Sequence, residues 1–261
     1  MNNKKNPFEV ETLRARLAKQ RDYKQLAKTY SKAYPAIKDF NTPNLWDSLN
    51  TKGVRGKNPM DDNRVKIVSD LIQGKKIKVL NVGFGSASLE KKYFKNHFQR
   101  DVTWKGIDIS LASVRKAKKE VSKAVFELGN ILDLTYQNNT FDYVVSLEVI
   151  EHIQPRNTFK ALKEIFRVVK PGKYFIVSVP LNEGLEGMIA KDENPNAHVR
   201  VYTPDLIKAE LEIVGFETLK TRTLFAFHNF YKFKTVIARL LPKRFKPNNI
   251  IVLAQKPIVH E

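Results

Sequence analysis

The residues best suited to chemistry lie in the segment Leu147-Glu148-Val149-Ile150-Glu151-His152. If this segment turns helically, Glu148, Glu151 and His152 are spaced i, i+3 and i+4 and share one face. Two kinds of chemistry are then open. His152 could act as a general base toward a hydroxyl, because its ordinary pKa is close to neutral pH. Alternatively, these three residues and the distant His198 could bind a divalent cation that lowers the pKa of a hydroxyl.

A glycine-containing turn lies upstream of this segment. The apolar run from Ile77 to Val82 is typical of a buried strand, and it breaks at Gly83 and Gly85 before residues 89–98, whose apolar spacing predicts a helix. Glycine lets the backbone turn sharply and approach a ligand closely, and free N–H groups at a helix start can hold polar atoms. The turn lacks the third glycine of a dinucleotide fingerprint and the Gly-Lys-Ser/Thr of a triphosphate site. The segment around Gly83 and Gly85 could therefore be a ligand-binding loop or only a structural turn between strand and helix.

The next predicted strand, residues 102–109, has the acidic residue Asp108 at its carboxyl end, beside Ile109. A carboxylate at this position can accept hydrogen bonds from both hydroxyls of a ribose. Because ligands of open parallel sheets bind at the carboxyl ends of the strands, Asp108 favours the ligand-loop interpretation.

Helical and strand patterns alternate through the rest of the chain. We expect helices over 61–72, 111–122, 155–169 and 204–214 and strands over 124–128, 141–147 and 174–179. Thr203 as N-cap, Pro204 at the first helical position and Gly215 past the end frame the last helix. This alternation predicts a parallel sheet with right-handed crossovers, closed by a strand pair over 216–225 and 249–256.

Five segments, in this order, resemble the class I S-adenosylmethionine-dependent methyltransferases of the type 11/23 kind. They are Leu80–Ala87, Gly106–Ile109, Gly129–Leu134, Asn139–Ile153 and Val169–Pro180. The resemblance implies an α/β fold with a Rossmann-like, seven-stranded, mostly parallel, doubly wound sheet that has one antiparallel strand. It also implies S-adenosylmethionine as the cofactor. The chain departs from the family at Asn81, where an acidic residue is usual, and at Ala87, where glycine is usual.

The resemblance also implies site residues. The implied cofactor-binding residues are Asn81, Gly83, Phe84, Gly85, Asp108, Ile109, Asn130, Ile131 and Leu147. In this assignment the Asn130 amide and the Ile131 N–H bind the adenine edge, and Ile109 packs on its face. The catalytic candidates are His152, Glu148 and His198.

The set Glu148, Glu151, His152 and His198 resembles the metal site of small-RNA 3′-terminal 2′-O-methyltransferases, and ubiquinone-pathway O-methyltransferases carry a similar Glu-His element. This resemblance implies Mg²⁺ or Mn²⁺ as a second cofactor. Many relatives carry Glu-His here without a metal, so a purely structural role in the loop stays open.

The composition favours an acidic partner. The chain has 261 residues, no cysteine and a formal net charge of +19. Residues 1–60 carry 13 Lys or Arg against 5 Asp or Glu, and residues 217–261 carry 9 against 2. Nucleic acid, anionic lipid or a phosphorylated substrate would suit such ends, although solvated lysines would give the same balance. Because no signal peptide or membrane span is recognisable, we expect a cytoplasmic protein. Peripheral attachment to the inner face of the membrane is a second option.

Residues 1–60 are expected to form a helical extension that serves as a substrate lid, ahead of a methyltransferase domain over 61–261. Residues 8–34 have helical spacing, and a loop with Pro43, Gly53 and Gly56 follows. Trp46, Arg55 and Lys57 could face the acceptor, with packing or solvent exposure as the alternative.

Residues 226–247 are expected to form a basic amphipathic insertion. Between Lys232 and Lys246 there are six basic residues and no acidic one, interleaved with aromatic and aliphatic residues. Such a helix is typical of a membrane surface or of a phosphate-rich binding face. Packing of its apolar side on the sheet is the alternative.

These observations predict methyl transfer to a hydroxyl of a glycan, glycolipid or related small molecule. The ending of the chain is similar to methyltransferases that accompany glycosyltransferases in surface-polysaccharide synthesis, which agrees with a lipid-linked acceptor. The alternatives are a metal-dependent RNA 2′-O-methyltransferase, favoured by the charge and the Glu/His set, and a noncatalytic scaffold, made conceivable by Asn81 and Ala87.

Overall fold

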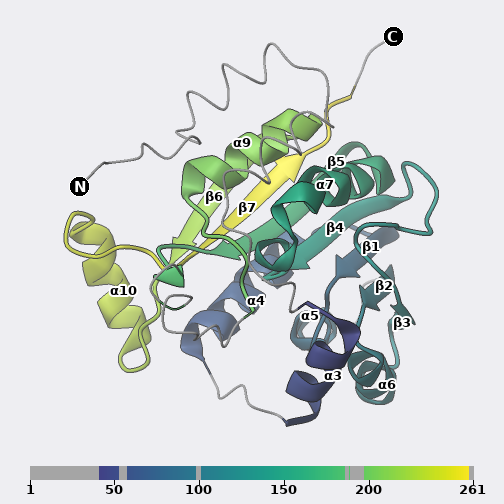
Figure 1. Cartoon of the computed structure of the whole chain (residues 1–261), viewed down its shortest axis with the longest axis horizontal. Coiled ribbons are helices and arrows are strands. Elements are labelled where there is room, and N and C mark those ends of the chain that lie inside the picture. Colours follow the sequence, from purple (N-terminus) through teal and green to yellow (C-terminus); the bar gives the residue numbers. More distant parts are fainter. Residues whose placement is uncertain (1–40, 53–57, 98–100, 186–187, 189–196, 259–261) are drawn as a thin grey trace.

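A computed structural model of the protein describes residues 41–52, 58–97, 101–185, 188 and 197–258. The predicted helix over 8–34, Arg55 and Lys57 lie outside these residues. The described chain forms one seven-stranded sheet in the order β3-β2-β1-β4-β5-β7-β6 (Figure 1). The strands are β1 (Ile77–Val82), β2 (Val102–Asp108), β3 (Val125–Leu128), β4 (Phe141–Leu147), β5 (Val169–Pro180), β6 (Glu217–Leu224) and β7 (Asn249–Gln255).

Strand direction confirms the predicted sheet. Strands β1 to β5 pair in parallel, whereas β7 pairs antiparallel with both β5 and β6. Strand β7 is therefore the single antiparallel strand, and β6 runs in the same direction as β5. The carboxyl end of β6 consequently lies at the same edge of the sheet as the carboxyl ends of β1, β4 and β5.

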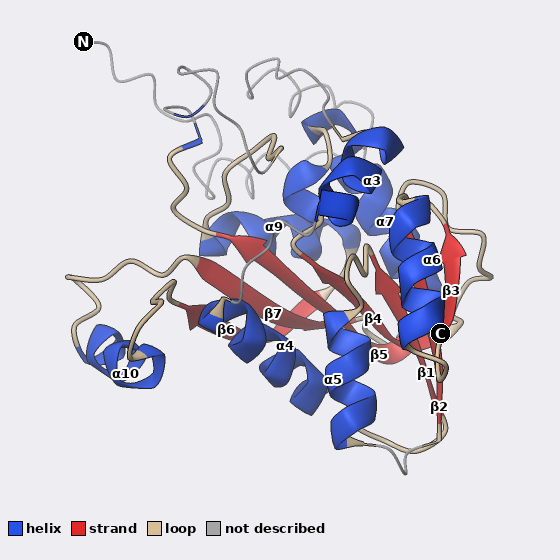
Figure 2. Ribbon diagram, turned by 90° about the horizontal axis from the view of Figure 1, so that it is seen from below, coloured by secondary structure: helices blue, strands red, loops and turns tan. Residues whose placement is uncertain are grey.

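Helices cover both faces of the sheet, as Figure 2 shows. Helices α4 (Pro59–Leu71) and α5 (Ser88–Asn96) pack with β1 around Val79 and Trp104, and α6 (Leu111–Glu120) lies beside α5 on β2 and β3. Helices α7 (Thr158–Val168) and α9 (Pro204–Val214) cover the opposite face. The chain is therefore doubly wound.

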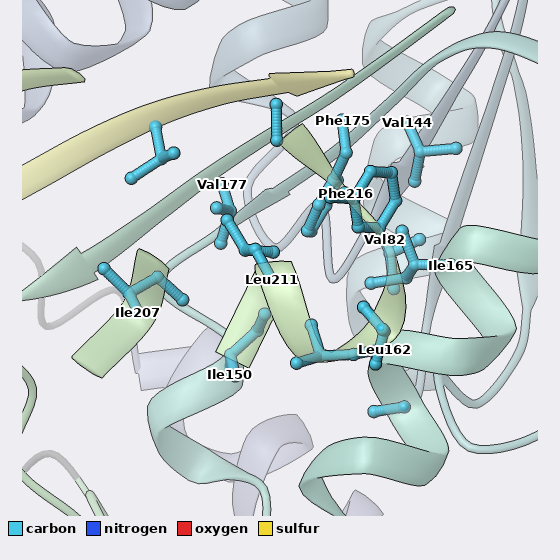
Figure 3. Packing of buried hydrophobic residues seen from close by; sticks show 14 of the residues in the cluster. Val82, Val144, Ile150, Leu162, Ile165, Phe175, Val177, Ile207, Leu211 and Phe216 are labelled. Atoms are coloured by element: carbon cyan, nitrogen blue, oxygen red, sulfur yellow. The ribbon is translucent and has the colours of Figure 1, made fainter. Parts of the chain in front are cut away.

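The larger part of the core lies under α7 and α9. Val144, Phe175 and Val177 of the central strands contact Leu162 and Ile165 of α7 (Figure 3). All five side chains are fully buried. Because helices cover both faces, β4 and β5 contain the unbroken apolar runs Tyr143–Val145 and Tyr174–Val177 instead of an alternating pattern.

Helix α9 has the predicted ends. The Thr203 hydroxyl accepts a hydrogen bond from Leu206 N at 3.1 Å, Pro204 occupies the first turn, and Gly215 adopts a left-handed conformation with φ of 104°. Each device satisfies or removes backbone groups that a helix end leaves unpaired. Helix α7 instead begins later than expected, after a 3-10 turn over Pro155–Asn157, and β5 already begins at Val169.

Helix α3 (Pro43–Lys52) replaces an expected loop. The prediction was wrong because this helix has little apolar periodicity of its own, and its side chains bind other elements. Asp47 Oδ1 accepts hydrogen bonds from Ser110 Oγ at 2.6 Å and Ala112 N at 3.0 Å at the start of α6. Tertiary contacts of this kind are invisible to local sequence patterns.

A helix also lies between β6 and β7. Helix α10 (Tyr231–Leu240) lies within the connection 225–248, at the periphery of the molecule in both views (Figures 1 and 2). Among the described helices, none has the length and apolar composition needed to cross a lipid bilayer.

Candidate functional site

The candidate site lies at the carboxyl ends of β1, β2 and β4. These neighbouring parallel strands end at Val82, Asp108 and Leu147, and their following turns meet at one edge of the sheet. Ligands of open α/β sheets bind at this edge. The predicted glycine loop, carboxylate and Glu/His segment are therefore brought together.

The glycine loop contacts the segment after β4. Gly83 has φ of 73°, and a Cβ at this position would lie 2.5 Å from Val149 Cγ2. Only glycine fits this approach without displacing Val149. Gly85 has φ of 54°, but a Cβ there would meet no described atom within 4 Å. The loop therefore touches the segment after β4 on one side and leaves room for a ligand on the other.

Asp108 is held against this loop. Its Oδ2 accepts a hydrogen bond from Gly85 N and its Oδ1 one from Ser110 N, both at 2.9 Å. Burial raises the pKa of Asp108, and these two hydrogen bonds oppose the rise by favouring the charged form. Each oxygen retains a lone pair for a further donor. The arrangement fits a ligand that offers hydroxyl groups, such as a ribose.

The structure explains Asn81 by its pairing with Glu90. Asn81 Nδ2 donates to Glu90 Oε1 at 2.8 Å, and Trp104 Nε1 donates to the same oxygen at 3.0 Å. Glu90 is fully buried, and this burial raises its pKa. An aspartate at position 81 would place two carboxylates in contact, which burial does not tolerate when both are ionised. Asn81 Oδ1 is buried and has no hydrogen-bond partner within the described chain, so it could accept a ligand's amino group.

The other cofactor candidates are spread around the same edge. Ile109 and Leu147 are half-buried, and Asn130 is exposed, with its Oδ1 accepting a hydrogen bond from Leu132 N at 2.9 Å. Ile131 is buried in the core beneath α7. The Phe84 ring packs on Phe126 at 4.7 Å and lies in the apolar cluster under α6, so only its backbone lines the glycine loop.

Glu148 does not share a helical face with Glu151 and His152. The expected helical turn was wrong, because Glu148 adopts a left-handed conformation with φ of 56° and only Ile150–His152 form a short 3-10 turn, η1. The Glu148 carboxylate instead accepts hydrogen bonds from Ser178 Oγ at 2.7 Å and Asn249 Nδ2 at 2.8 Å. It also forms an ion pair with Arg64 at 3.0 Å. These contacts tie β4, β5, β7 and α4 together.

Glu151, His152 and His198 do come together. The Nε2 atoms of His152 and His198 lie 4.0 and 3.9 Å from Glu151 Oε1, and the two imidazole rings are 4.8 Å apart. All three side chains are buried, and neither Glu151 oxygen has a hydrogen-bond partner among the described residues. Burial and the nearby Glu148 charge raise the pKa of Glu151. The ligand atoms of this trio lie within 4.8 Å of one another, so they could surround one cation.

Hydrogen bonds orient both imidazoles. His152 Nδ1 lies 3.2 Å from the carbonyl oxygen of Ala197, which can only accept, so Nδ1 carries the proton in the neutral ring. His198 Nδ1 lies 2.7 Å from Glu183 Oε2, and an ionised carboxylate gives the same tautomer. In this tautomer, Nε2 is the nitrogen of each ring that accepts a proton or binds a metal.

A buried arginine places His198 beside the turn. Arg200 pairs with Glu210 of α9 at 2.6 Å and donates to the Ile150 carbonyl at 3.0 Å. Val199 N also donates to the Glu151 carbonyl at 3.0 Å. The sequence did not identify Arg200 or Glu210 as positioning residues, because a buried ion pair has no local signature.

Helix α3 covers part of this edge. The Trp46 indole meets the His152 imidazole edge to face at 4.7 Å, and Asn41 Nδ2 donates to the His152 carbonyl at 2.9 Å. Asp47 binds the start of α6, two residues after Asp108, as described above. The sequence left Trp46 open between the acceptor side and ordinary packing. Asn41 and Asp47 were missed, because single polar residues in a presumed loop carry no distinctive pattern.

Known proteins show the same combination of sequence and fold. Residues 80–177 match the family model described as a methyltransferase domain. Norajmaline N-methyltransferase of Rauvolfia serpentina is 34% identical over 85 residues, which are 30% of this chain and 28% of that protein. Erythromycin 3″-O-methyltransferase of Saccharopolyspora erythraea is 31% identical over 113 residues, covering 40% of this chain and 36% of that protein. The matches thus span about a third of the length of these relatives.

A solved structure supports the fold assignment. The crystal structure of a SAM-dependent methyltransferase from Archaeoglobus fulgidus superposes with a TM-score of 0.60 at 17% identity, covering 80% of this chain and 99% of that one. The matched family segment contains the end of β1, the glycine loop, Asp108 and the Glu151-His152 turn. Residues 80–177 therefore match the methyltransferase domain family, and the fold of the described chain is that of an S-adenosylmethionine-dependent methyltransferase.

Proposed function

We propose that this protein transfers a methyl group from S-adenosylmethionine to a hydroxyl oxygen of a glycan, glycolipid or related small molecule. The observation that carries the proposal is the position of His152. Its unprotonated Nε2 lies beside Glu151 in the turn after β4, and that turn contacts the glycine loop through Val149 and Gly83. A base next to the cofactor loop suits an acceptor that must lose a proton.

The residues of the site have separable roles in this proposal. Bound S-adenosylmethionine supplies an electrophilic methyl group. Asp108 accepts hydrogen bonds from the ribose hydroxyls. At Gly85 the absence of a side chain lets the ligand approach the backbone closely. His152 Nε2 would take the hydroxyl proton while its Nδ1–H stays on the Ala197 carbonyl. As the methyl carbon bonds to the acceptor oxygen, its bond to the sulfonium sulfur would break and S-adenosylhomocysteine would leave. Alignment of acceptor and methyl group supplies most of the remaining rate gain.

Oxygen is favoured over nitrogen by the histidines. A neutral amine already carries a reactive lone pair, whereas a hydroxyl gains from a base or a cation. Relatives with each type of acceptor in their names are similar to this chain, so their names do not select the atom. The erythromycin relative is consistent with an O-methylated acceptor.

Metal-dependent catalysis, as in an RNA 2′-O-methyltransferase, is the second candidate. It is favoured by the two Glu151 oxygens, which accept no hydrogen bond from the described residues, and by the two Nε2 atoms beside them. Glu151, His152 and His198 would hold Mg²⁺ or Mn²⁺, and Glu183 and the Ala197 carbonyl would orient the two imidazoles. A bound cation would lower the pKa of the acceptor hydroxyl. In this candidate His152 is a ligand instead of the base.

Methyl transfer from labelled S-adenosylmethionine tests the proposal. We would incubate the full chain separately with a lipid extract, a polysaccharide fraction and total RNA, each with and without EDTA. Label in the lipid or polysaccharide fraction that survives EDTA supports the first candidate, and EDTA-sensitive label in RNA supports the second. His152→Gln should lower the rate about 100-fold or more and leave cofactor binding intact. The control His228→Gln replaces an exposed histidine in the β6–β7 connection and should have no effect.

A further inference from the structure

Helix α10 has an apolar stripe that faces solvent. Phe233, Val236 and Leu240 are 68%, 56% and 74% exposed, although large apolar side chains are usually covered. At 3.6 residues per turn, their three positions fall within about 60° around the helix axis. Phe230 before the helix and Leu241 after it are 80% and 46% exposed and lengthen the apolar surface.

Cationic side chains flank this stripe. Lys234 lies on one side of it and Lys232 and Arg239 on the other, by the same helical spacing. These three residues are exposed, as are Lys243, Arg244 and Lys246 after the helix. No acidic residue occurs between positions 225 and 248. Long basic side chains beside an exposed apolar stripe are typical of a helix that lies in a membrane interface.

The opposite side of α10 is attached to the molecule. Thr235 and Ala238 are buried, and the Tyr231 hydroxyl accepts a hydrogen bond from Asn63 Nδ2 of α4 at 3.1 Å. At the base of the connection, Phe227 packs between Phe225 at 5.8 Å and Phe245 at 6.0 Å. The apolar stripe is therefore held outward, and burying it requires a partner outside the described chain.

We propose that α10 and its flanking residues, 230–246, bind the surface of an anionic lipid bilayer. The hydrocarbon of a bilayer can bury Phe233, Val236 and Leu240, and its anionic headgroups can pair with the flanking cations. A single bilayer surface therefore binds both the apolar stripe and the basic side chains. A nucleic acid would pair the cations but would leave the aliphatic stripe in water, because phosphates and base edges dominate its contacts.

A neighbouring groove extends the positive surface. It has a volume of about 380 Å³, and its lining includes Lys220 and Arg222 of β6, Lys232 of α10 and the apolar residues Ile251 and Leu253 of β7. Lys66 and Asp70 of α4 also line it and form an ion pair with each other at 2.6 Å. The other three cations and the apolar residues suit a lipid headgroup with part of its chain. The groove thus continues the bilayer-binding surface from α10 onto the sheet.

Membrane binding would also orient the candidate site. The connection that carries α10 begins at the carboxyl end of β6, at the same edge as the Glu151-His152 turn. Asn249, the first residue after the connection in β7, donates to Glu148 Oε1 at 2.8 Å. An acceptor anchored in the bilayer would reach this edge of the sheet. The bilayer proposal itself does not depend on the proposed methyl transfer.

Vesicle flotation of the full chain tests the proposal without any activity assay. Vesicles of phosphatidylcholine alone are compared with vesicles containing about one third phosphatidylglycerol. We expect binding only to the anionic vesicles. Phe233→Ser with Leu240→Ser should weaken it at least about tenfold, and Lys232→Gln with Lys234→Gln about 30-fold. Val125→Thr on β3 and Lys118→Gln with Lys119→Gln on α6 alter exposed residues of the same kinds and should bind like the parent protein.

Three outcomes would overturn the proposal. The first is equal binding to neutral and anionic vesicles or to neither, with circular dichroism showing a folded protein. The second is retention of vesicle binding by the Phe233→Ser and Leu240→Ser variant together with salt-sensitive RNA binding, which would indicate a nucleic-acid face. The third is a dimer in analytical ultracentrifugation that the same variant dissociates, which would make a second copy the partner of the stripe.

Discussion

The Nε2 atom of His198 lies 3.9 Å from Oε1 of Glu151, although the two residues belong to different segments of the chain. The contact depends on Arg200, which fixes the segment after residue 197 beneath the η1 turn. Glu151, His152 and His198 therefore form one buried group at the end of β4. This group and the glycine loop are the two parts of the candidate site that can be tested separately.

Replacement of Glu151 tests cation binding. We expect Glu151→Gln to weaken Mn²⁺ binding about tenfold or more, because it removes the charged oxygen nearest both Nε2 atoms. Glu148→Gln is the matched control, since Glu148 contacts Ser178, Asn249 and Arg64 instead. Electron paramagnetic resonance of free Mn²⁺ measures the binding. If Glu148→Gln weakens Mn²⁺ binding as much as Glu151→Gln does, Glu148 is also a metal ligand. If the parent protein binds no Mn²⁺, the metal candidate is wrong and His152 stays the proposed base.

Alanine at the two loop glycines should separate stability from binding. Both positions have positive φ, which costs an alanine about 1–2 kcal/mol. Gly83→Ala adds the collision with Val149, so its melting temperature should fall further than that of Gly85→Ala. Gly85→Ala should instead weaken S-adenosylhomocysteine binding, because its methyl group enters the open side of the loop.

The collision at Gly83 can be checked with a second change. Val149→Ala should recover part of the stability lost in Gly83→Ala and none of that lost in Gly85→Ala, as a double-mutant cycle would measure. If Val149→Ala rescues both glycine variants equally, the proposed contact is not the cause.

Asn81→Asp should make stability depend strongly on pH. The pKa of Glu90 is already raised by burial, so its contribution to stability is largest below its ordinary pKa of about 4.5 and falls as the pH rises. A second carboxylate would raise the pKa of the pair further and cost about 1–3 kcal/mol at neutral pH. Urea unfolding at several pH values measures this loss, which should shrink as the pH falls.

The double variant Asn81→Asp with Glu90→Gln provides the control, because it restores a single carboxylate. Its free energy of unfolding should return toward the parent value at neutral pH. A loss at pH 7 that Glu90→Gln does not relieve would mean that Asn81 is required for a reason other than the charge of Glu90.

The sequence predicted the elements that have strong local patterns. The buried strands β1, β4 and β5, helix α9 with its caps at Thr203 and Gly215, and the position of Asp108 all follow from apolar runs and turn residues. The motif order further predicted the single antiparallel strand, and the sheet confirms it.

The parts that depend on distant contacts were not predicted. Helix α3 is stabilised through Asp47 and Trp46, and the left-handed Glu148 is stabilised through Ser178 and Asn249. A helical wheel cannot predict the contacts of α3 or the left-handed conformation of Glu148. It assumes a regular helical backbone and contains no information about distant residues. Pairing of Glu90 with Asn81 was likewise missed, since buried side-chain partners are set by packing between α5 and β1.

Isothermal titration with S-adenosylhomocysteine tests the central claim most directly. The parent protein should bind it with micromolar affinity, and Asp108→Ala should weaken binding at least about tenfold, since a charge-assisted hydrogen bond contributes about 1.5–3 kcal/mol. Asp142→Ala is the control, because Asp142 is a buried aspartate near the amino end of β4, at the opposite edge of the sheet from Asp108, and pairs with Lys170. A folded parent protein that binds no S-adenosylhomocysteine, or equal affinities for the Asp108 and Asp142 variants, would contradict the account.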